Sequence, residues 1–282
     1  MIIFAIPLKA KKASKDWETC EKRFWETIQS IFNQKGEFKV IVACNDIPNN
    51  IDIEYDDRLE FIQVNTPIPQ RWIEMARDKF WKLTVIAVRI REILELQEKP
   101  EQGIYVMPVD GDDLLNCNIA EWCSKYPHEN GFVSEEGDVW EEKKQYLRIY
   151  KEMYTYCGSC NVIKMYREDL PEELPVSPKL CHDKETAEKL NAVYPIRWDH
   201  HTMREKYQKL GKTFSILPFK STIYRIDTGD NISAVYGEEN QSVNKQRSRF
   251  HPIAFLRKIN IFKIKRITPK IKKEFGLTKE DN

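Results

Sequence analysis

Long apolar runs are missing from this chain of 282 residues, and their absence excludes several classes of protein. No stretch approaches the roughly 18 apolar residues that a membrane-spanning helix needs. The N-terminal segment MIIFAIPL lacks the basic region and the apolar length of a secretory signal. The ten glycines and fourteen prolines follow no period, and no internal repeat or low-complexity block is present. A content of 41% hydrophobic and 11% aromatic residues argues against disorder, so a globular fold is expected.

Paired cysteines and an excess of charge are also missing. The seven cysteines are an odd number spread over the chain and do not resemble a disulfide framework, so a reducing cytoplasm is the simplest compartment. The net charge is only +1, from 45 Lys and Arg against 44 Asp and Glu. This balance conceals an asymmetry, because residues 245–282 carry a net +9 and residues 1–244 a net −8. The sequence therefore predicts an acidic body with a basic C-terminal extension.

Apolar runs alternate with amphipathic segments along the first 110 residues. The runs predict strands at residues 2–6, 38–43, 59–64 and 103–109, and helical spacing predicts helices over 16–33 and 72–97. Such alternation is typical of βαβ units. The predicted fold class is α/β, with a mostly parallel central sheet flanked by helices. It forms a single domain over residues 1–244, followed by the basic extension over 245–282.

Acidic side chains follow two of the predicted strands. Asp46 comes after the second strand, and the segment Asp110–Asp113, of sequence DGDD, directly follows the fourth. Ligands of such sheets bind outside the carboxyl ends of the strands. Three carboxylates within four residues repel one another unless a cation lies among them, and hard divalent ions prefer carboxylate and phosphate oxygens. A metal site is therefore predicted here, with a solvated acidic turn or a helix N-cap as the alternative.

Four short motifs follow one another between residues 110 and 233. They are the strand with DGDDLL at 110–115, Asp199–Arg204 with a charged helix and Gly211, Leu217–Phe219, and Tyr224–Ser233. Together they resemble the Asp-x-Asp motif, the acidic motif with its helix and glycine, and the closing Tyr-Arg-x-His-x-x-x-x-Ser element of family 2-type glycosyltransferases with the GT-A fold. The resemblance covers roughly residues 1–233.

This resemblance implies a hexosyltransferase-type enzyme of cell-surface glycan or polysaccharide synthesis. It would move a sugar with inversion from a nucleotide diphosphate to an acceptor hydroxyl, on a glycan or a lipid-linked acceptor, with Mg²⁺ or Mn²⁺ as cofactor. Asp112 would be the first metal ligand, Asp110 would bind the metal or the ribose, and Asp113 would support them. Gly111 would contact the donor. Asp227 stands where many relatives have a metal-binding His, so it either completes the metal site or caps its loop.

Further residues would border the nucleotide if the resemblance holds. Asn45 and Asp46 lie where the family holds the nucleobase, although Asn-Asp-x-Pro is also a good turn. Pro7, in the loop after the first strand, would border the same base. Lys79 and Lys82 are three residues apart on a predicted helix, where they would face the diphosphate or lie on a solvated helix face.

The best match to the family's general base is Asp199, which begins an amphipathic helix. Trp198-Asp199 stands where the usual pattern is Glu-Asp, which leaves His200 and His201 as substitutes. A neutral histidine can itself accept a proton, because its pKa lies near neutrality.

A zinc site is a weaker reading of the cysteines. Cys157 and Cys160, with Cys181-His182 twenty residues on, superficially resemble a zinc ligand set, but the second half lacks a paired spacing. Free, partly buried thiols are expected instead. Residues 154–157 predict a strand leading to a glycine turn, and the resemblance implies that this turn lines the acceptor side of the cleft.

Two polar stretches are expected to lie at the surface. Residues 135–144 predict an exposed turn and a solvated charged stretch. Residues 168–196 are rich in proline and lack periodicity, which predicts a long loop and, in this fold, an acceptor-binding insertion.

The C-terminal extension mixes basic and apolar residues. Residues 250–273 form a basic amphipathic segment suited to an anionic membrane surface, which would make the protein peripheral on the inner face of the membrane. The alternative is a C-terminal helix packed on the domain. No nucleic-acid recognition motif is present, so no nucleic-acid partner is expected.

Two other functions fit parts of the pattern. A nucleotidyltransferase that makes a nucleotide-sugar would be expected to show a glycine-rich basic loop after the first strand, and residues 7–12 contain no glycine. A catalytically inactive GT-A-like module that binds nucleotide is the non-enzymatic alternative, for which Asp227 is the one hint.

Overall fold

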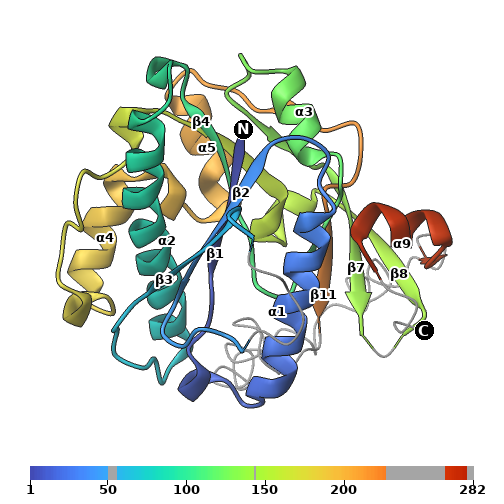
Figure 1. The fold of residues 1–282 in the computed structure, drawn as a ribbon, viewed down its shortest axis with the longest axis horizontal. Coiled ribbons are helices and arrows are strands. Elements are labelled where there is room, and N and C mark those ends of the chain that lie inside the picture. The colour runs from blue at the N-terminus through green and yellow to red at the C-terminus, as the bar shows by residue number, and fades with distance from the viewer. Residues whose placement is uncertain (50–55, 143, 227–263, 278–282) are drawn as a thin grey trace, which may run out of the picture.

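The computed structural model describes residues 1–49, 56–142, 144–226 and 264–277, and its centre is a seven-stranded sheet (Figure 1). Four of the six strand pairings in this sheet are parallel, and only the pairings of β9 are antiparallel. In spatial order the strands are β10 (Ser215–Ile216), β6 (Gly131–Val133), β9 (Asn161–Met165), β4 (Ile104–Pro108), β1 (Ile2–Pro7), β2 (Phe38–Cys44) and β3 (Leu59–Gln63). The predicted α/β class with a mostly parallel central sheet is confirmed.

Strand β1 divides the core into two layers, because its successive side chains point to opposite faces. Ile2, Phe4 and Ile6 pack on one face with α1 (Trp17–Phe32) and α3 (Ile119–Lys125). Ile3 and Ala5 pack on the other face with α2 (Trp72–Glu95) and α5 (His200–Lys209). All five side chains are fully buried, which is why the strand reads as an unbroken apolar run.

The helices begin where the sequence supplies a capping group. Asp16 accepts a hydrogen bond from the backbone N–H of Thr19 at the start of α1, and Asp183 does the same for Thr186 in α4 (Lys184–Val193). Each cap satisfies a backbone donor that the first helical turn leaves unpaired. The strands and helices predicted over residues 2–109 are confirmed, with bounds that shift by a few residues at most.

A second, smaller sheet lies beside the first and was not predicted. Its five strands are β12 (Ile264–Arg266), β8 (Tyr146–Lys151), β7 (Glu136–Glu141), β11 (Thr222–Ile226) and β5 (Leu114–Leu115), and only β7 and β11 pair in parallel. The predicted exposed turn over residues 135–144 is therefore wrong. Asp138 in β7 is fully buried, and its carboxylate pairs with Lys220 at 2.8 Å and Lys265 at 2.5 Å. The charged residues of this stretch predict exposure to solvent, whereas lysines from distant parts of the chain neutralise Asp138 inside the fold.

Two other local predictions are wrong. Residues 154–157 do not form a strand, because Met153–Thr155 is a 3₁₀ turn followed by a second such turn over Gly158–Cys160. The stretch 168–196 is not a long loop, because α4 and three short 3₁₀ turns occupy much of it. Helix α4 is short and largely exposed, so its apolar periodicity is weak.

Part of the basic extension packs on the second sheet. In helix α9 (Pro269–Phe275), Ile271 and Phe275 are buried against Trp140 and Leu147. The backbone carbonyl of Glu274 accepts a hydrogen bond from the N–H of Cys117 at 2.8 Å. The predicted alternative of a packed C-terminal helix is thus what residues 264–277 adopt.

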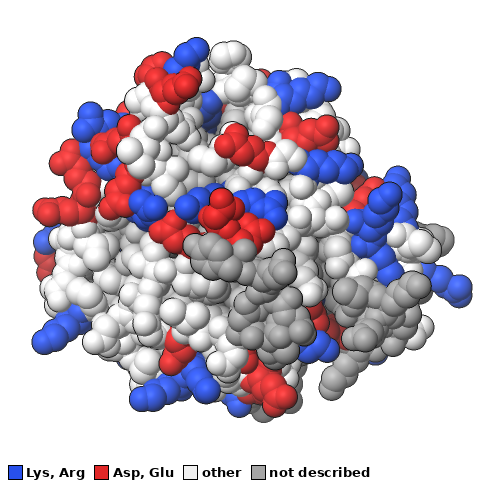
Figure 2. Space-filling model, viewed as in Figure 1, with Lys and Arg blue, Asp and Glu red and all other residues white. Residues whose placement is uncertain are grey.

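The rest of the extension is not tested. The boundary at residue 244 and residues 250–263 lie outside the described residues, so the separate extension stays a prediction. Figure 2 shows Lys and Arg gathered over α9, where the side chain of Lys270 is 83% exposed. Among the described helices, none combines the length and the apolarity needed to cross a membrane.

Replacement of Phe275 by alanine tests the docking of α9. Since Phe275 is 2% exposed, Phe275→Ala is expected to lower the free energy of unfolding by about 3 kcal/mol, through lost apolar contacts and the cavity left behind. Urea unfolding of the full chain measures it. The matched control is Lys270→Ala on the exposed face of the same helix, with an expected change within about 0.5 kcal/mol. Equal effects of the two substitutions would contradict the packing.

Candidate functional site

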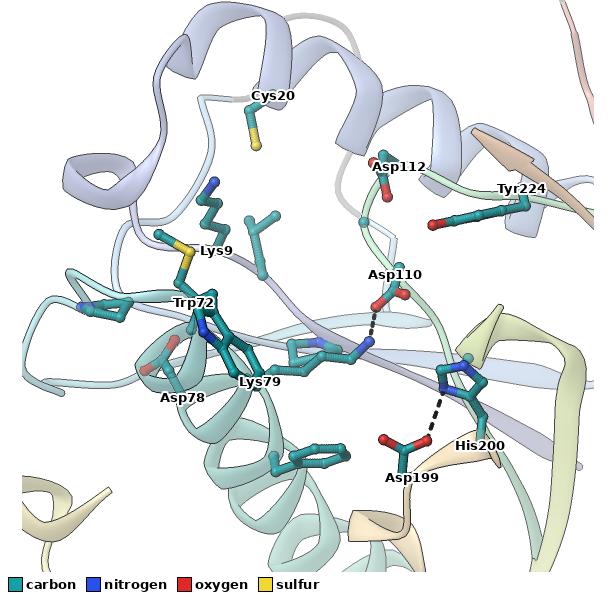
Figure 3. Close-up of a pocket in the computed structure, with 18 of the residues that line it drawn as sticks. Lys9, Cys20, Trp72, Asp78, Lys79, Asp110, Asp112, Asp199, His200 and Tyr224 are labelled. Carbon is teal, nitrogen blue, oxygen red and sulfur yellow. Dashed lines mark hydrogen bonds and ion pairs between the residues drawn. The ribbon is translucent and has the colours of Figure 1, made fainter. Parts of the chain in front are cut away.

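A pocket of about 420 Å³ opens at the carboxyl edge of the central sheet (Figure 3). Its residues come from the loop after β1, from α1 and α2, from the turn after β4, from the 156–158 segment, and from the start of α5. They include Pro7, Leu8, Lys9, Cys20, Arg23, Pro69, Trp72, Met75, Lys79, Asp110, Gly111, Asp112, Tyr156, Gly158, Asp199, His200, His201 and Tyr224. Segments from across the chain therefore meet at the edge where a parallel sheet binds ligands.

Two contacts hold Asp110 in the lining of this pocket. Its backbone N–H donates to the hydroxyl of Ser159 at 2.9 Å, and its carboxylate forms an ion pair with Lys79 of α2. Burial alone would lower the pKa of Lys79, but the charge and hydrogen bond of Asp110 raise it overall. Lys79 is therefore a charged ammonium group at neutral pH.

Asp112 differs from the other two acids of the DGDD turn, because its side chain lacks a hydrogen-bond or ion-pair partner among the described residues. It is half-buried, and within the part of the chain that the structure describes it makes no hydrogen bond or ion pair. Burial, together with the negative charge of Asp110, raises the pKa of Asp112 to about 6, and this outweighs the opposing charges of Arg225, Arg23 and Lys79. A half-buried carboxylate of this kind is suited to bind a cation.

Asp113 faces the interior instead of the pocket. It is fully buried and accepts hydrogen bonds from Ser159 Oγ at 2.6 Å, Cys157 Sγ at 3.2 Å and the backbone N–H of Arg225 at 3.2 Å. Burial, with the charges of Asp112 and Asp110, raises its pKa well above the usual range. Asp113 thus joins the DGDD turn to β11 and to the 157–160 segment.

The predicted base candidates lie together at the start of α5. Asp199 caps the helix by accepting a hydrogen bond from the N–H of His201 at 2.8 Å, and its side chain is 53% exposed. His200 Nδ1 lies 3.6 Å from the same carboxylate oxygen. Burial lowers the pKa of His200 to about 4, so this imidazole is neutral at pH 7. Of the two, Asp199 is the more accessible proton acceptor.

Several residues predicted to border the nucleotide do not line the pocket. Asp46 accepts a hydrogen bond from the backbone N–H of Lys11 at 2.9 Å, and the amide of Asn45 donates to Thr66 Oγ1 at 2.9 Å. Both side chains therefore stabilise loops, as the turn alternative for this segment requires. Pro7, Gly111 and Lys79, in contrast, do line the pocket.

Both predicted positions of Lys82, toward the diphosphate or on a solvated helix face, are wrong. Lys82 is fully buried and donates to Asp78 Oδ2 at 2.6 Å and to the backbone carbonyl of Leu8 at 2.8 Å. One helical turn separates it from Asp78, which neutralises it, and the bond to Leu8 fixes the loop after β1. Its function in the fold is thus to position the wall of the pocket. Asp227, the third predicted metal ligand, lies outside the described residues.

The sequence analysis missed an apolar wall of the pocket and Arg23. Pro69, Trp72 and Met75 line the pocket at the start of α2. Arg23 of α1 lines it too and pairs with Glu142 at 2.5 Å, while Arg225 pairs with the same Glu142 at 3.1 Å. One signal was available for Trp72, since a residue at the first turn of a helix that follows a parallel strand lies near the sheet's carboxyl edge.

The zinc reading does not fit the geometry of the cysteines. Cys181 and His182 lie with Asp78, and neither Cys157 nor Cys160 belongs to a group of three potential ligands in the described residues. Burial also raises the pKa of Cys181 to about 12, so its thiol stays protonated, as expected for a free buried cysteine.

Comparison with known proteins finds only distant structural likeness. No family model matches the chain, and no curated protein matches it. The chain is similar in structure to S. aureus TarS 1–349 in complex with UDP-GlcNAc, at 13% identity and a TM-score of 0.43 over 83% of this chain and 60% of that one. It is also similar to S. aureus TarS 1–349 in complex with UDP, at 13% identity and a TM-score of 0.41 over 81% of this chain and 61% of that one. The chain thus spans about 60% of the length of these neighbours, and at such scores likeness in outline does not transfer an activity.

The raised pKa of Asp112 predicts that its charge destabilises the free protein. The folded state binds this proton more tightly than the unfolded state, so the stabilisation is present below about pH 4 and is lost as the pH rises through about 6. Asp112→Asn is therefore expected to raise the free energy of unfolding by about 1 kcal/mol at pH 7.5 in chelator-treated buffer, after allowance for solvent screening. The gain should vanish at pH 4. Urea unfolding at both pH values measures it.

A matched control has the opposite sign. Asp183 caps α4, and its hydrogen bonds to the backbone and side chain of Thr186 lower its pKa, so its charge stabilises the fold at neutral pH. Asp183→Asn should therefore lower stability at pH 7.5. A destabilised Asp112→Asn protein at this pH would contradict the assignment of Asp112 as an uncompensated charge.

Proposed function

We propose that the protein is a metal-dependent, inverting glycosyltransferase that uses a nucleotide-sugar donor. The observation that carries the proposal is the unpartnered carboxylate of Asp112 beside Asp110, at one end of a pocket with an apolar wall at its other end. The volume of about 420 Å³ lies within the range of small-molecule sites. A nucleotide diphosphate has the same two-part character, since its base is flat and its phosphates are anionic.

The apolar wall supports a place for the nucleobase. Trp72, Met75 and Pro69 offer an aromatic and aliphatic surface, and Figure 3 shows Trp72 on the side of the pocket away from Asp112. Stacking on such a surface is sequence-tolerant and worth about 1–3 kcal/mol per base in nucleic-acid complexes. The diphosphate would then extend toward Lys79 and Arg23.

The acidic end fits a hard divalent ion. Asp112 offers carboxylate oxygens that make no hydrogen bond or ion pair with the described residues, and Asp110 lies in the same turn. Mg²⁺ or Mn²⁺ held there would neutralise the charge that develops on the diphosphate leaving group. Whether Asp227 adds a ligand remains the sequence-based hypothesis.

Asp199 is the proposed general base. It lies in the same pocket as Asp110, its side chain is half-exposed, and one of its oxygens is fixed by the N-cap bond to His201. A fixed carboxylate can accept the proton of an acceptor hydroxyl as the new bond forms. His200 is the weaker candidate, because burial that lowers its pKa also opposes the charged product of proton transfer.

The acceptor side is proposed to lie along the 156–158 segment. Tyr156 is 55% exposed and lines the pocket, and Arg204 covers the ring of Tyr154 at 4.5 Å. Exposed tyrosines are suited to stack on sugar faces. A glycan or lipid-linked acceptor presented at an anionic membrane surface would also meet the basic face of α9, and we retain this surface as the proposed docking site.

The alternatives have less support. A nucleotidyltransferase would need a mobile glycine-rich loop after β1, whereas this loop has no glycine and Lys82 fixes the carbonyl of Leu8. An inactive module would retain nucleotide binding and would not need a base, yet Asp199 is present in the pocket.

Calorimetric titration with UDP and with GDP, each with and without Mn²⁺, tests the proposal. The wild-type protein is expected to bind one of these nucleotides at least tenfold more tightly with Mn²⁺, and Asp112→Asn is expected to remove that gain by removing a metal ligand. Asp46→Asn is the matched control, because this acid lies outside the pocket. Absence of metal-dependent nucleotide binding would overturn the proposal.

Asp199→Asn tests the base. Sugar transfer, or donor hydrolysis where the acceptor is unknown, is expected to fall by about 10²–10⁴-fold, while nucleotide affinity stays within a few-fold. The amide keeps the cap of α5, so the helix is retained. Turnover measured over a panel of nucleotide-sugars reads out the change, with His200→Gln as the comparison. Full activity of Asp199→Asn would show that Asp199 is not the general base.

A further inference from the structure

We propose that Lys79 is a resident counter-ion for Asp110 that couples divalent-metal binding to nucleotide binding. The inference rests on the proposed function and extends it to the order in which the ligands bind. In the free protein Lys79 neutralises Asp110. When a nucleotide diphosphate enters, the phosphates take over Lys79, and Asp110 becomes available to the metal.

The position of the ammonium group is the first support. Lys79 reaches from α2 to the carboxylate of Asp110, which follows β4, and forms an ion pair with it inside the pocket (Figure 3). Both side chains are largely shielded from water, with 24% of Lys79 and 30% of Asp110 exposed. No other basic side chain in the described residues forms an ion pair with Asp110.

The backbone near Gly158 packs against the ion pair of Lys79 and Asp110. A Cβ atom on Gly158 would lie 3.7 Å from Lys79 Nζ, 3.8 Å from Asp110 Oδ2 and 3.9 Å from His200 Nδ1. The pair thus lies against the backbone of the 157–160 segment. The open side of the pair is the pocket itself, where a diphosphate is proposed to bind.

The net charge of Asp110, Asp112 and Lys79 determines how strongly the site attracts a metal ion. Asp110 and Asp112 with Lys79 in place present a net single negative charge, whereas the two carboxylates alone present two. A divalent ion beside the ammonium group would also be repelled by it, and this repulsion is strong in a site shielded from water. Bare metal should therefore bind weakly.

A nucleotide diphosphate removes both obstacles. Its oxygens give Lys79 a new anionic partner and give the ion additional hard ligands. Each ligand then strengthens the binding of the other by the same factor, because linkage between two sites is reciprocal. Lys79 is thus a positioning residue that sets the size of this coupling.

The test measures Mn²⁺ binding to the full chain at pH 7.5, by the electron paramagnetic resonance signal of free Mn²⁺, with and without the nucleotide that binds. Lys79→Met keeps the length of the side chain and removes its charge. It is expected to tighten Mn²⁺ binding in the absence of nucleotide by about tenfold and to reduce the nucleotide-dependent gain by a similar factor. Lys79→Arg keeps the charge and should bind bare Mn²⁺ as the wild type does.

Lys189→Met is the matched control, because Lys189 of α4 also pairs with a carboxylate, that of Glu185 at 2.8 Å, but is 74% exposed and lies outside the pocket. It changes the net charge equally and should alter bare Mn²⁺ affinity by no more than about twofold. Equal gains in Mn²⁺ affinity from Lys189→Met and Lys79→Met would show an effect of net charge alone and would overturn the inference. Unchanged or weaker bare Mn²⁺ binding by Lys79→Met would overturn it too.

The two proposals fail in different ways. If the wild-type protein binds no nucleotide with Mn²⁺, the proposed function fails. If it does bind them together but the coupling is the same in Lys79→Met, only the inference about Lys79 fails. Circular dichroism of each variant checks the fold, and Lys79→Gln replaces Lys79→Met if the latter does not fold.

Discussion

Three carboxylates within four residues follow β4, and the structure of the pocket depends on how each of them is accommodated. Asp110 pairs with an ammonium group from α2. Asp113 is fully buried and accepts three hydrogen bonds, and burial raises its pKa well above the usual range in spite of them. Asp112 alone has no partner among the described residues. Like charges this close cannot share one environment, and the fold separates them by giving each a different one.

The supports of this turn come from distant parts of the chain. Ser159 bonds to both Asp110 and Asp113, which ties the turn to the 157–160 segment. Across the pocket, the buried pair of Lys82 and Asp78 fixes the loop after β1 through the carbonyl of Leu8. A buried ion pair is weak evidence for stability, since desolvation opposes the attraction, but it holds geometry well. Contacts from distant parts of the chain thus support both sides of the acidic turn.

The sequence predicted what short-range patterns determine. The strands β1 to β4 are apolar runs and the first helices are amphipathic, so these strands of the central sheet and the position of Asp110 and Asp112 at its edge could be predicted. The strands β6, β9 and β10 were not predicted, and Asp199 was a candidate through the family resemblance. The second sheet could not be predicted, because β7 carries charged residues. Its Asp138 is neutralised by Lys220 and Lys265, which are 82 and 127 positions away along the chain. No local pattern shows that pairing.

The same reason explains the errors at single residues. Asp46 and Lys82 have the chemical type that a nucleotide site needs, and their spacing agreed with it. In the structure, Asp46 accepts a hydrogen bond from the backbone N–H of Lys11. Lys82 donates to Asp78 and to the backbone carbonyl of Leu8. A charged side chain in a polar cluster can serve the fold or a ligand, and only its contacts decide which. The basic extension is a similar case, since Lys265 neutralises a buried acid while Lys270 is exposed.

Asp112 is where stability and function separate most clearly. An ionised carboxylate that is half-buried and unpaired opposes folding, and an asparagine of the same shape would remove that opposition. Lys79 neutralises the charge of Asp110 but forms no ion pair with Asp112. A protein selected only for stability would have no reason to keep a third acid in this turn. Residues that oppose stability without a compensating contact concentrate at functional sites. The isolation of Asp112 therefore supports the proposed cation site, in which bound ligands would complete the charge balance of the pocket.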